Sequence, residues 1–264
     1  MTPQQHQHQQ LLATATTAVH TAAARVTRAA QTPTTSAELF AALGANDKAV
    51  SDILQPALTG ALPGSRWTQD EHASGPMPDG DWWVVDPVGG NMNAVQGMSD
   101  WNIGVSLVRD NRPVLAVLYA GAADETFTAI AGGGAFLNGV PLRASAKTDL
   151  ALALTGTGQA KLNRDAANAE RVGAAVAAMM QHALYVRASV PVGHQLSQVA
   201  AGRMDAHWQF ENLRSHIAPV LLTQEAGATV TDLEGEPWQI TSDAYLAAAP
   251  GVHAAALNVL RPLK

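Results

Sequence analysis

The stretch DWWVVDPVGGNMNAVQG, at residues 81–97, constrains the fold more than any other part of the sequence. It opens with an apolar run rich in aromatic and β-branched residues, which is typical of a buried strand. Proline and paired glycines follow at once and predict a tight turn where the strand ends. One carboxylate, Asp86, stands at this junction. We therefore expect a polar site at the end of a buried strand.

Helical and extended patterns alternate along the rest of the chain. In the first half, the pattern predicts helices at 11–30 and 46–64, a cap at Ser36 before a short helical or turn segment, and strand pairs at 101–121 and 125–145. In the second half, it predicts strands at 152–160, 184–190, 204–210 and 228–235, and helices at 163–183, 193–202 and 215–227. This alternation predicts an α/β protein with a mixed sheet in each half, divided into an N-terminal lobe at 1–148 and a C-terminal lobe at 149–264.

Composition excludes several classes of function. With 264 residues and 47% hydrophobic content, the chain is long enough to bury a full core. A formal charge of -6, without any Lys/Arg block longer than two, argues against nucleic acid as a partner. The sequence has no cysteine, which excludes disulfides and thiolate chemistry. No apolar run reaches membrane-spanning length, and the polar start MTPQQHQHQQ lacks the features of a secretory signal, so we expect a frayed terminus and a cytoplasmic protein.

Several segments share their pattern with one protein family. The turn DPVGGNMN matches the form D-P-[IV]-D-G-T-[TS]-N in its first three residues, its second glycine and its last asparagine. The segments GGGAFLNGVPLRAS, QVAAGRMDAHW, TQEAGATVTDLEGEPW and YLAAAPGVHAAALNVLR continue the match along the chain. Together they resemble the inositol monophosphatase family of magnesium-dependent sugar-phosphate phosphatases. The resemblance implies a layered α-β-α-β-α sandwich, a magnesium cofactor, a small phosphorylated substrate and a homodimer.

The acidic residues of that family are only partly present in the first half. The resemblance places Asp70 and Glu71 at the family's acidic pair and keeps Asp86 as the first carboxylate of the turn. The second turn carboxylate, which bridges metal ions in the family, is Gly89 here. The threonine that helps to orient the attacking water in the family is Asn91.

The later positions depart from the family as well. Ser215 and His216 stand where the family has its W-D pair, and Gln209 replaces an acidic contact to the sugar hydroxyls. Asp47, which in the family partners the lost threonine, is kept. Magnesium ions need several anionic oxygen ligands, and the members of such a site fail together. These losses predict that the ordinary multi-magnesium activity is gone.

We therefore predict an enzyme repurposed on this scaffold for acid–base chemistry on a small polar or anionic metabolite, with no metal or one divalent cation. A buried carboxylate with a raised pKa, beside a neutral histidine at a helix start, is suited to proton transfer. The candidate catalytic residues are Asp86, His216, Glu71 and Asp70, and the candidate ligands for a residual metal ion are Asp70, Glu71 and Asp86. The candidate substrate contacts are Asp47, Gly89, Gly90, Asn91, Asn93, Arg187, His194 and Gln209.

Two other functions stay open: a non-catalytic pseudo-phosphatase that binds a protein or senses a metabolite, and a residual magnesium-dependent sugar-phosphate phosphatase. For Asp86, the alternative is a turn-capping residue bonded to the amides of Gly89 and Gly90. His207, beside Trp208 on a predicted strand, is expected in the core or at an interface. As partners we expect a small-molecule substrate and a second copy of the chain, and neither nucleic acid nor a membrane.

Overall fold

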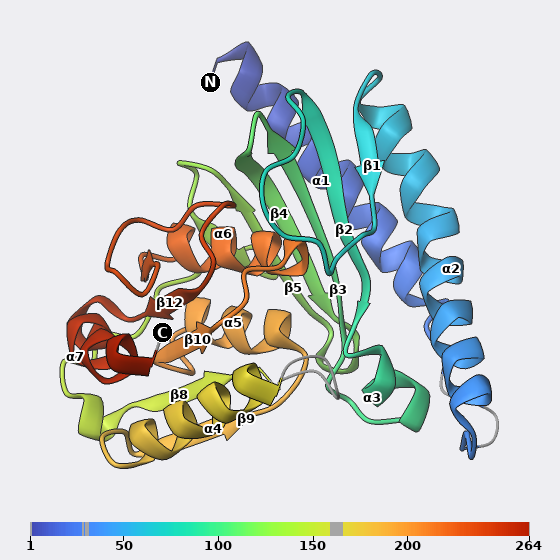
Figure 1. Ribbon diagram of the computed structural model, residues 1–264. Coiled ribbons are helices and arrows are strands. Elements are labelled where there is room, and N and C mark those ends of the chain that lie inside the picture. Colours follow the sequence, from blue (N-terminus) through green and yellow to red (C-terminus); the bar gives the residue numbers. More distant parts are fainter. Residues whose placement is uncertain (1, 28, 30–31, 159–165, 264) are drawn as a thin grey trace.

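The computed structural model describes residues 2–27, 29, 32–158 and 166–263 (Figure 1). In this part of the chain, the first sheet has seven strands that follow one another in sequence order. They pair antiparallel except β1 and β2, which are parallel. The elements of this half are α1 (Pro3–Ala23), α2 (Ser36–Ala61), β1 (Arg66–Thr68), β2 (Asp81–Gly89), α3 (Asn91–Gln96), β3 (Asn102–Arg109), β4 (Arg112–Ala120), β5 (Glu125–Ile130), β6 (Ala135–Leu137) and β7 (Val140–Pro141).

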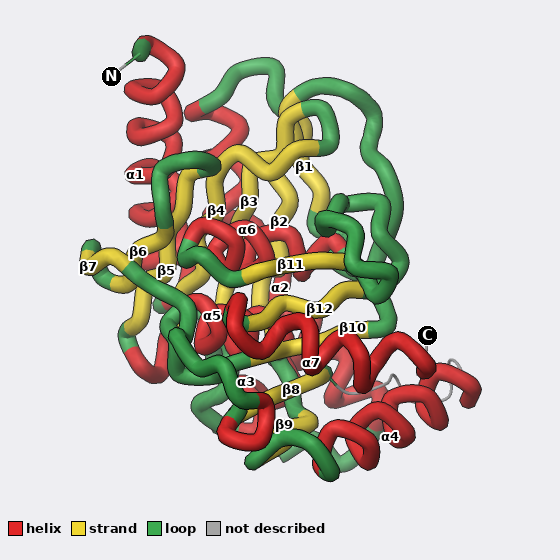
Figure 2. The backbone as a smooth tube through the Cα atoms, turned by 90° about the vertical axis from the view of Figure 1, so that its left-hand side faces the viewer, coloured by secondary structure: helices red, strands yellow, loops and turns green. Residues whose placement is uncertain are grey.

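The second sheet has the strand order β11-β12-β10-β8-β9 and contains both parallel and antiparallel pairs. Figure 2 shows its strands running across the direction of those in the first sheet. Its elements are β8 (Leu154–Thr157), α4 (Ala166–Met180), β9 (Tyr185–Ala188), α5 (Val192–Ala200), β10 (Ala206–Gln209), η3 (Arg214–His216), α6 (Ile217–Glu225), β11 (Thr229–Thr231), β12 (Tyr245–Ala248) and α7 (Pro250–Leu260). Short 3-10 turns lie at Gly121–Ala123, Leu150–Leu152 and Arg261–Leu263.

The helices and sheets form five layers (Figure 1). Helices α1 and α2 cover one face of the first sheet, and α6 packs against β4 and β5 on the other face. Helix α5 lies beside α6 and contacts the second sheet, whose far face is covered by α4 and α7. The predicted α/β fold with two mixed sheets in a layered α-β-α-β-α sandwich is therefore confirmed. The division into lobes at 1–148 and 149–264 stays a prediction.

The two halves are joined by packing and by backbone hydrogen bonds. One buried cluster includes Val84 and Val108 of the first sheet together with Trp238 and Tyr245 of the second half. The loop after β1 is also fastened to η3: the Ser215 N–H donates to the carbonyl of residue 71 at 3.1 Å, and the N–H of residue 214 donates to that of residue 73 at 2.9 Å. The C-terminal half thus fixes the backbone of an acidic loop that belongs to the N-terminal half.

The structure corrects two predictions near the N-terminus. Helix α1 begins at Pro3 and not at Leu11, so the polar start of the chain is helical and the expected frayed terminus is wrong. The reason is a capping box, in which the Thr2 hydroxyl accepts the Gln5 N–H and the Gln5 side chain accepts the Thr2 N–H. The second helix runs unbroken from residue 36 to residue 61, and its N-cap is Thr35, in a capping box with Glu38, and not Ser36.

Two further points concern the chain as a whole. The C-terminal end of the strand predicted at 152–160 and the start of the helix predicted at 163–183 lie outside the described residues. Among the helices that the structure describes, none combines the length and the hydrophobicity that a membrane span requires.

Candidate functional site

Asp86 lies near the C-terminal end of β2. Between Asp86 and Gly89, the pairing of β2 with β3 shifts its register. Such an irregularity re-aims side chains at the end of a strand. The carboxyl group is buried, and its Oδ1 accepts no hydrogen bond from the described residues. Burial raises the pKa of Asp86 well above its usual range, and a hydrogen bond and charge from Glu71, followed by the charge of Asp47, raise the pKa further. Asp86 is therefore an acidic group set up to hold a proton or to meet a cation.

Glu71 and Asp47 complete an acidic cluster that comes from three separate elements. Glu71 lies in the loop after β1, where His72 is 3.4 Å from its carboxylate. Asp47 lies on α2, and its pKa is raised to about 6 by partial burial and by the charge of Glu71, against a hydrogen bond from Asn91 that lowers it. The neighbouring Asp70 is exposed and does not join this cluster. The structure thus brings together three of the expected acids and leaves one at the surface.

Asn91, at the start of α3, has a structural role. Its side-chain amide donates to Asp47 Oδ1 at 2.7 Å and to the Leu43 carbonyl at 2.9 Å. Its Oδ1 accepts a hydrogen bond from Asn46 at 3.0 Å. Both amide protons are therefore spent on α2, and none is left to hold a substrate or a water molecule. Asn91 orients Asp47 and ties the turn after β2 to the covering helix.

The glycines of the turn lie in a crowded place. A Cβ atom on Gly89 would lie 2.6 Å from Asp86 Oδ2 and 2.7 Å from Asn102 Nδ2. Gly90 has a φ of 74°, and a Cβ atom there would lie 2.8 Å from Pro191 Cδ. Asn102 is only 1% exposed and was missed by the sequence analysis. The signal that was available is a polar residue at the start of an otherwise apolar strand.

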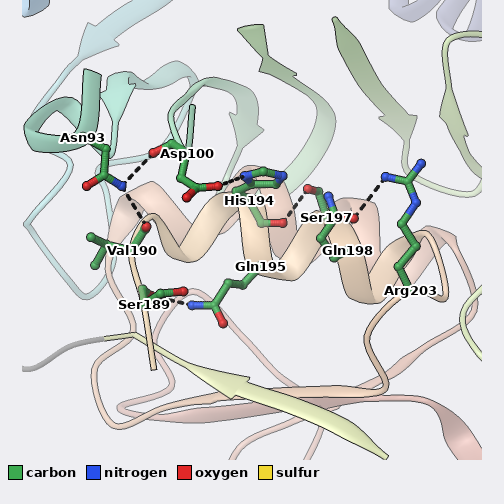
Figure 3. Close-up of polar contacts among 9 residues, drawn as sticks. All are labelled: Asn93, Asp100, Ser189, Val190, His194, Gln195, Ser197, Gln198 and Arg203. Carbon is green, nitrogen blue, oxygen red and sulfur yellow. Dashed lines mark hydrogen bonds and ion pairs between the residues drawn. The ribbon is translucent and has the colours of Figure 1, made fainter. Parts of the chain in front are cut away.

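The start of α5 forms a second polar group beside the turn (Figure 3). Asn93 donates to the carbonyls of Asp100 at 2.8 Å and Val190 at 3.1 Å, which clamps α3 to the segment before α5. Asp100 points toward His194 on α5, with 3.9 Å between Oδ1 and Nδ1. Burial lowers the pKa of His194, although Asp100 acts in the opposite direction. Arg187 lines the same small hollow as His194, outside the acidic cluster.

The two remaining candidates lie in the second half. His216 is buried at the start of α6, where its Nδ1 accepts the Leu213 N–H at 3.3 Å and its ring packs edge-on against Tyr245. A hydrogen bond from Glu71 is among the causes that raise the pKa of Asp86, and the acid–base pair expected between Asp86 and His216 stays a prediction. Gln209 packs over Gly158, and its Nε2 has no hydrogen-bond partner in the described chain.

The acidic cluster fits one hard cation better than several. Among the described residues, no group of three or more His, Asp or Glu side chains is arranged to hold a metal ion. Glu71 and Asp86 are nevertheless in contact, and Asp86 Oδ1 is unpartnered. Magnesium often takes one or two protein carboxylates and completes its shell with water and phosphate oxygens. The residues present fit such a site and do not fit an arrangement of several ions.

A layered α/β fold with carboxylates gathered at the end of one strand is typical of an enzyme. Comparison with known proteins identifies the family. The chain belongs to the inositol monophosphatase family, which matches residues 7–262. It is 34% identical over 193 residues to a probable inositol 1-monophosphatase, ImpA, of Mycobacterium tuberculosis, covering 72% of each chain. It is 31% identical to inositol monophosphatase 2 of Solanum lycopersicum, covering 81% of this chain and 83% of the relative. The inositol monophosphatase of Anabaena (Nostoc) sp. PCC 7120 superposes with a TM-score of 0.82 at 25% identity, over 97% of both chains.

Proposed function

We propose that this protein hydrolyses a small phosphate monoester with the help of one divalent cation held at Glu71 and Asp86. The observation that carries the proposal is the contact between these two carboxylates, in which Asp86 keeps one buried oxygen without a partner. Family membership supports the substrate class, because the relatives are named as inositol monophosphatases. The proposal replaces the repurposed acid–base enzyme, which we expected from the sequence, as the leading function.

A cation bound between Glu71 and Asp86 would neutralise both charges, polarise a phosphate and lower the pKa of a bound water. Proton transfer and the positioning of the site depend on the protein's own side chains. Asp47 has a pKa of about 6, so at neutral pH it is mostly ionised and suited to accept a proton from water. Asn91 holds Asp47 in place through the 2.7 Å hydrogen bond. Asn93 keeps the turn against the start of α5, so that the polar groups there border the same site.

Acid–base catalysis without a metal is a second candidate, and one observation favours it. A hydrogen bond between two carboxyl groups requires that they share a proton, and burial raises the pKa of Asp86. A buried carboxyl group whose pKa is raised can serve as a general acid or base. In this reading, Glu71 and Asp86 form the proton-transfer pair, and the substrate need not carry phosphate.

A phosphate-release assay tests the proposal. We would offer inositol 1-phosphate and a panel of sugar phosphates, with added Mg²⁺, with added Mn²⁺ and with a chelator. We expect phosphate release that depends on the cation and falls by about 100-fold or more in Asp86→Asn and Glu71→Gln. Asp52→Asn, at an exposed residue of α2 that pairs with Lys48, is the matched control and should leave the rate unchanged.

The other outcomes decide between the remaining functions. Turnover that persists in the chelator and still requires Asp86 would overturn the single-cation proposal in favour of metal-free acid–base chemistry. A folded protein that turns over none of these phosphates under any condition would favour the pseudo-phosphatase hypothesis. Homodimer formation stays a prediction and is measured separately, by light scattering.

A further inference from the structure

Asn102 is the residue whose position the proposed function does not yet explain. It begins β3, pairs in register with Gly89 across the two strands, and is almost fully buried. Its neighbours on β3 are apolar or small, so a carboxamide at this place has no obvious packing purpose. Its Oδ1 has no hydrogen-bond partner among the described residues. A buried amide oxygen that lacks a donor costs free energy unless something else meets it.

The carboxamide fills the space that a side chain on Gly89 would need. The Cβ position of Gly89 lies 2.7 Å from Asn102 Nδ2, 3.1 Å from Asn102 Oδ1 and 2.6 Å from Asp86 Oδ2. Asp86 and Asn102 therefore reach toward one point from neighbouring strands. Gly89 has no side chain at this point, and the side chain of Asn102 on β3 lies there instead.

Two buried acceptor oxygens without partners lie on this pair of side chains, Asp86 Oδ1 and Asn102 Oδ1. A third wall comes from α5, where a Cβ atom on Gly193 would lie 3.2 Å from Asn102 Oδ1. Each of these two oxygens can be satisfied by a hydrogen-bond donor or by a cation. Carboxylate and amide oxygens are the ligands that hard divalent cations take in proteins.

We propose that Asn102, through its Oδ1, is a neutral oxygen ligand for the divalent cation at Glu71 and Asp86. The inference rests on the proposed function and deepens it, because it assigns a third protein ligand to that site. A ligand without charge leaves the site with one negative charge fewer than a carboxylate at position 89 would give. The site should therefore bind a divalent cation more weakly than an all-carboxylate site and hold one ion rather than a bridged pair.

Direct binding of Mn²⁺, followed by the loss of the free-ion electron paramagnetic resonance signal, tests this without any turnover. We expect Asn102→Ala to weaken Mn²⁺ binding by about 10-fold or more and Asn102→Asp to strengthen it by a similar factor. Ser106→Ala is the matched control, since Ser106 is a buried polar residue four positions further along β3, on the same face as Asn102 and Gly104. It should bind Mn²⁺ as the unaltered protein does.

A second measurement tests the shared space and needs no metal. Gly89→Asp should lower the urea midpoint of unfolding, and adding Asn102→Ala should restore part of it by removing the colliding amide. If Asn102→Ala binds Mn²⁺ normally, the inference is overturned and the single-cation proposal stands. If the unaltered protein binds no Mn²⁺ at millimolar concentration, both fall. If the double variant is no more stable than Gly89→Asp, the shared space is refuted.

Discussion

Replacing Asp47 by Asn should make the protein more stable at neutral pH and leave it unchanged in acid. Asp47 has a pKa of about 6 in the folded protein, against 3.8 for an unperturbed group. Between these values the folded protein binds the proton more tightly than the unfolded chain does. Stability therefore falls as the pH rises from about 4 to about 6, and the whole cost remains above that range. The charge of Asp47 opposes folding wherever the protein is expected to work.

The size of this cost follows from the shift. A difference of about 2 pKa units corresponds to about 3 kcal/mol at most. Asp47 is only partly buried, so solvent screening reduces the figure, and we expect about 1–2 kcal/mol. The substitution keeps an oxygen that accepts the hydrogen bond from Asn91 and removes the charge. Asp47→Asn should thus gain this amount at pH 7.5 and almost nothing at pH 4.

Urea unfolding at both pH values, in the presence of a chelator, measures the difference. Asp52→Asn serves as the control, because Asp52 lies on the same helix, is exposed and pairs with Lys48 at 2.6 Å. Its free energy of unfolding should change by less than about 0.5 kcal/mol at either pH. A gain for Asp47→Asn of equal size at pH 4 and pH 7.5, or a loss at pH 7.5, would refute the electrostatic reasoning.

Three further predictions concern stability. Gly90→Ala should lower the free energy of unfolding by about 2–4 kcal/mol, because Gly90 has a positive φ and a Cβ there collides with Pro191; calorimetry measures the lowered midpoint. His207→Leu should stabilise the protein by about 1 kcal/mol at pH 7, because both ring nitrogens lack partners in the described chain. Burial lowers the pKa of His207 to about 3, so the native protein loses stability as the pH falls from about 6.5, and urea unfolding at pH 5 should show a larger gain for this variant. Lys147→Ala should cost about 1–2 kcal/mol in urea unfolding, because the buried Asp205 carboxylate then keeps only the hydrogen bond from the Leu154 N–H, while the half-exposed lysine limits the loss; adding Asp205→Asn should recover part of it.

Most of the fold could be predicted from the sequence, because the patterns that indicate helices, strands and turns are local. The apolar run before Asp86, the turns between the strand pairs and the alternation in the second half each depend on neighbouring residues. The N-terminus is an exception, because its polar composition indicates a frayed end while a local capping box, Thr2 to Gln5, starts a helix there. A cap with good geometry stabilises a helix start even where the residues after it are polar.

The candidate site was less predictable because its contacts depend on register and on distant segments. Asp86, Glu71 and Asp47 were all expected, but their mutual contact needs three elements to meet. Asn102 faces Gly89 only because of how β3 pairs with β2, and no spacing in the sequence reveals that pairing. The His216 ring packs edge-on against Tyr245, a residue that lies well beyond it in the chain.

The backbone hydrogen bonds between the loop after β1 and η3 affect the order in which the acidic cluster is assembled during synthesis. Glu71 leaves the ribosome long before Ser215, whose N–H holds the Glu71 carbonyl at 3.1 Å. A nascent chain can therefore carry every carboxylate of the cluster and still lack the backbone contact that positions one of them. Products that end before residue 215, and separated fragments, should be unable to sequester a cation until the C-terminal part is present. The backbone around Glu71 is in this sense completed only after the C-terminal half has been made.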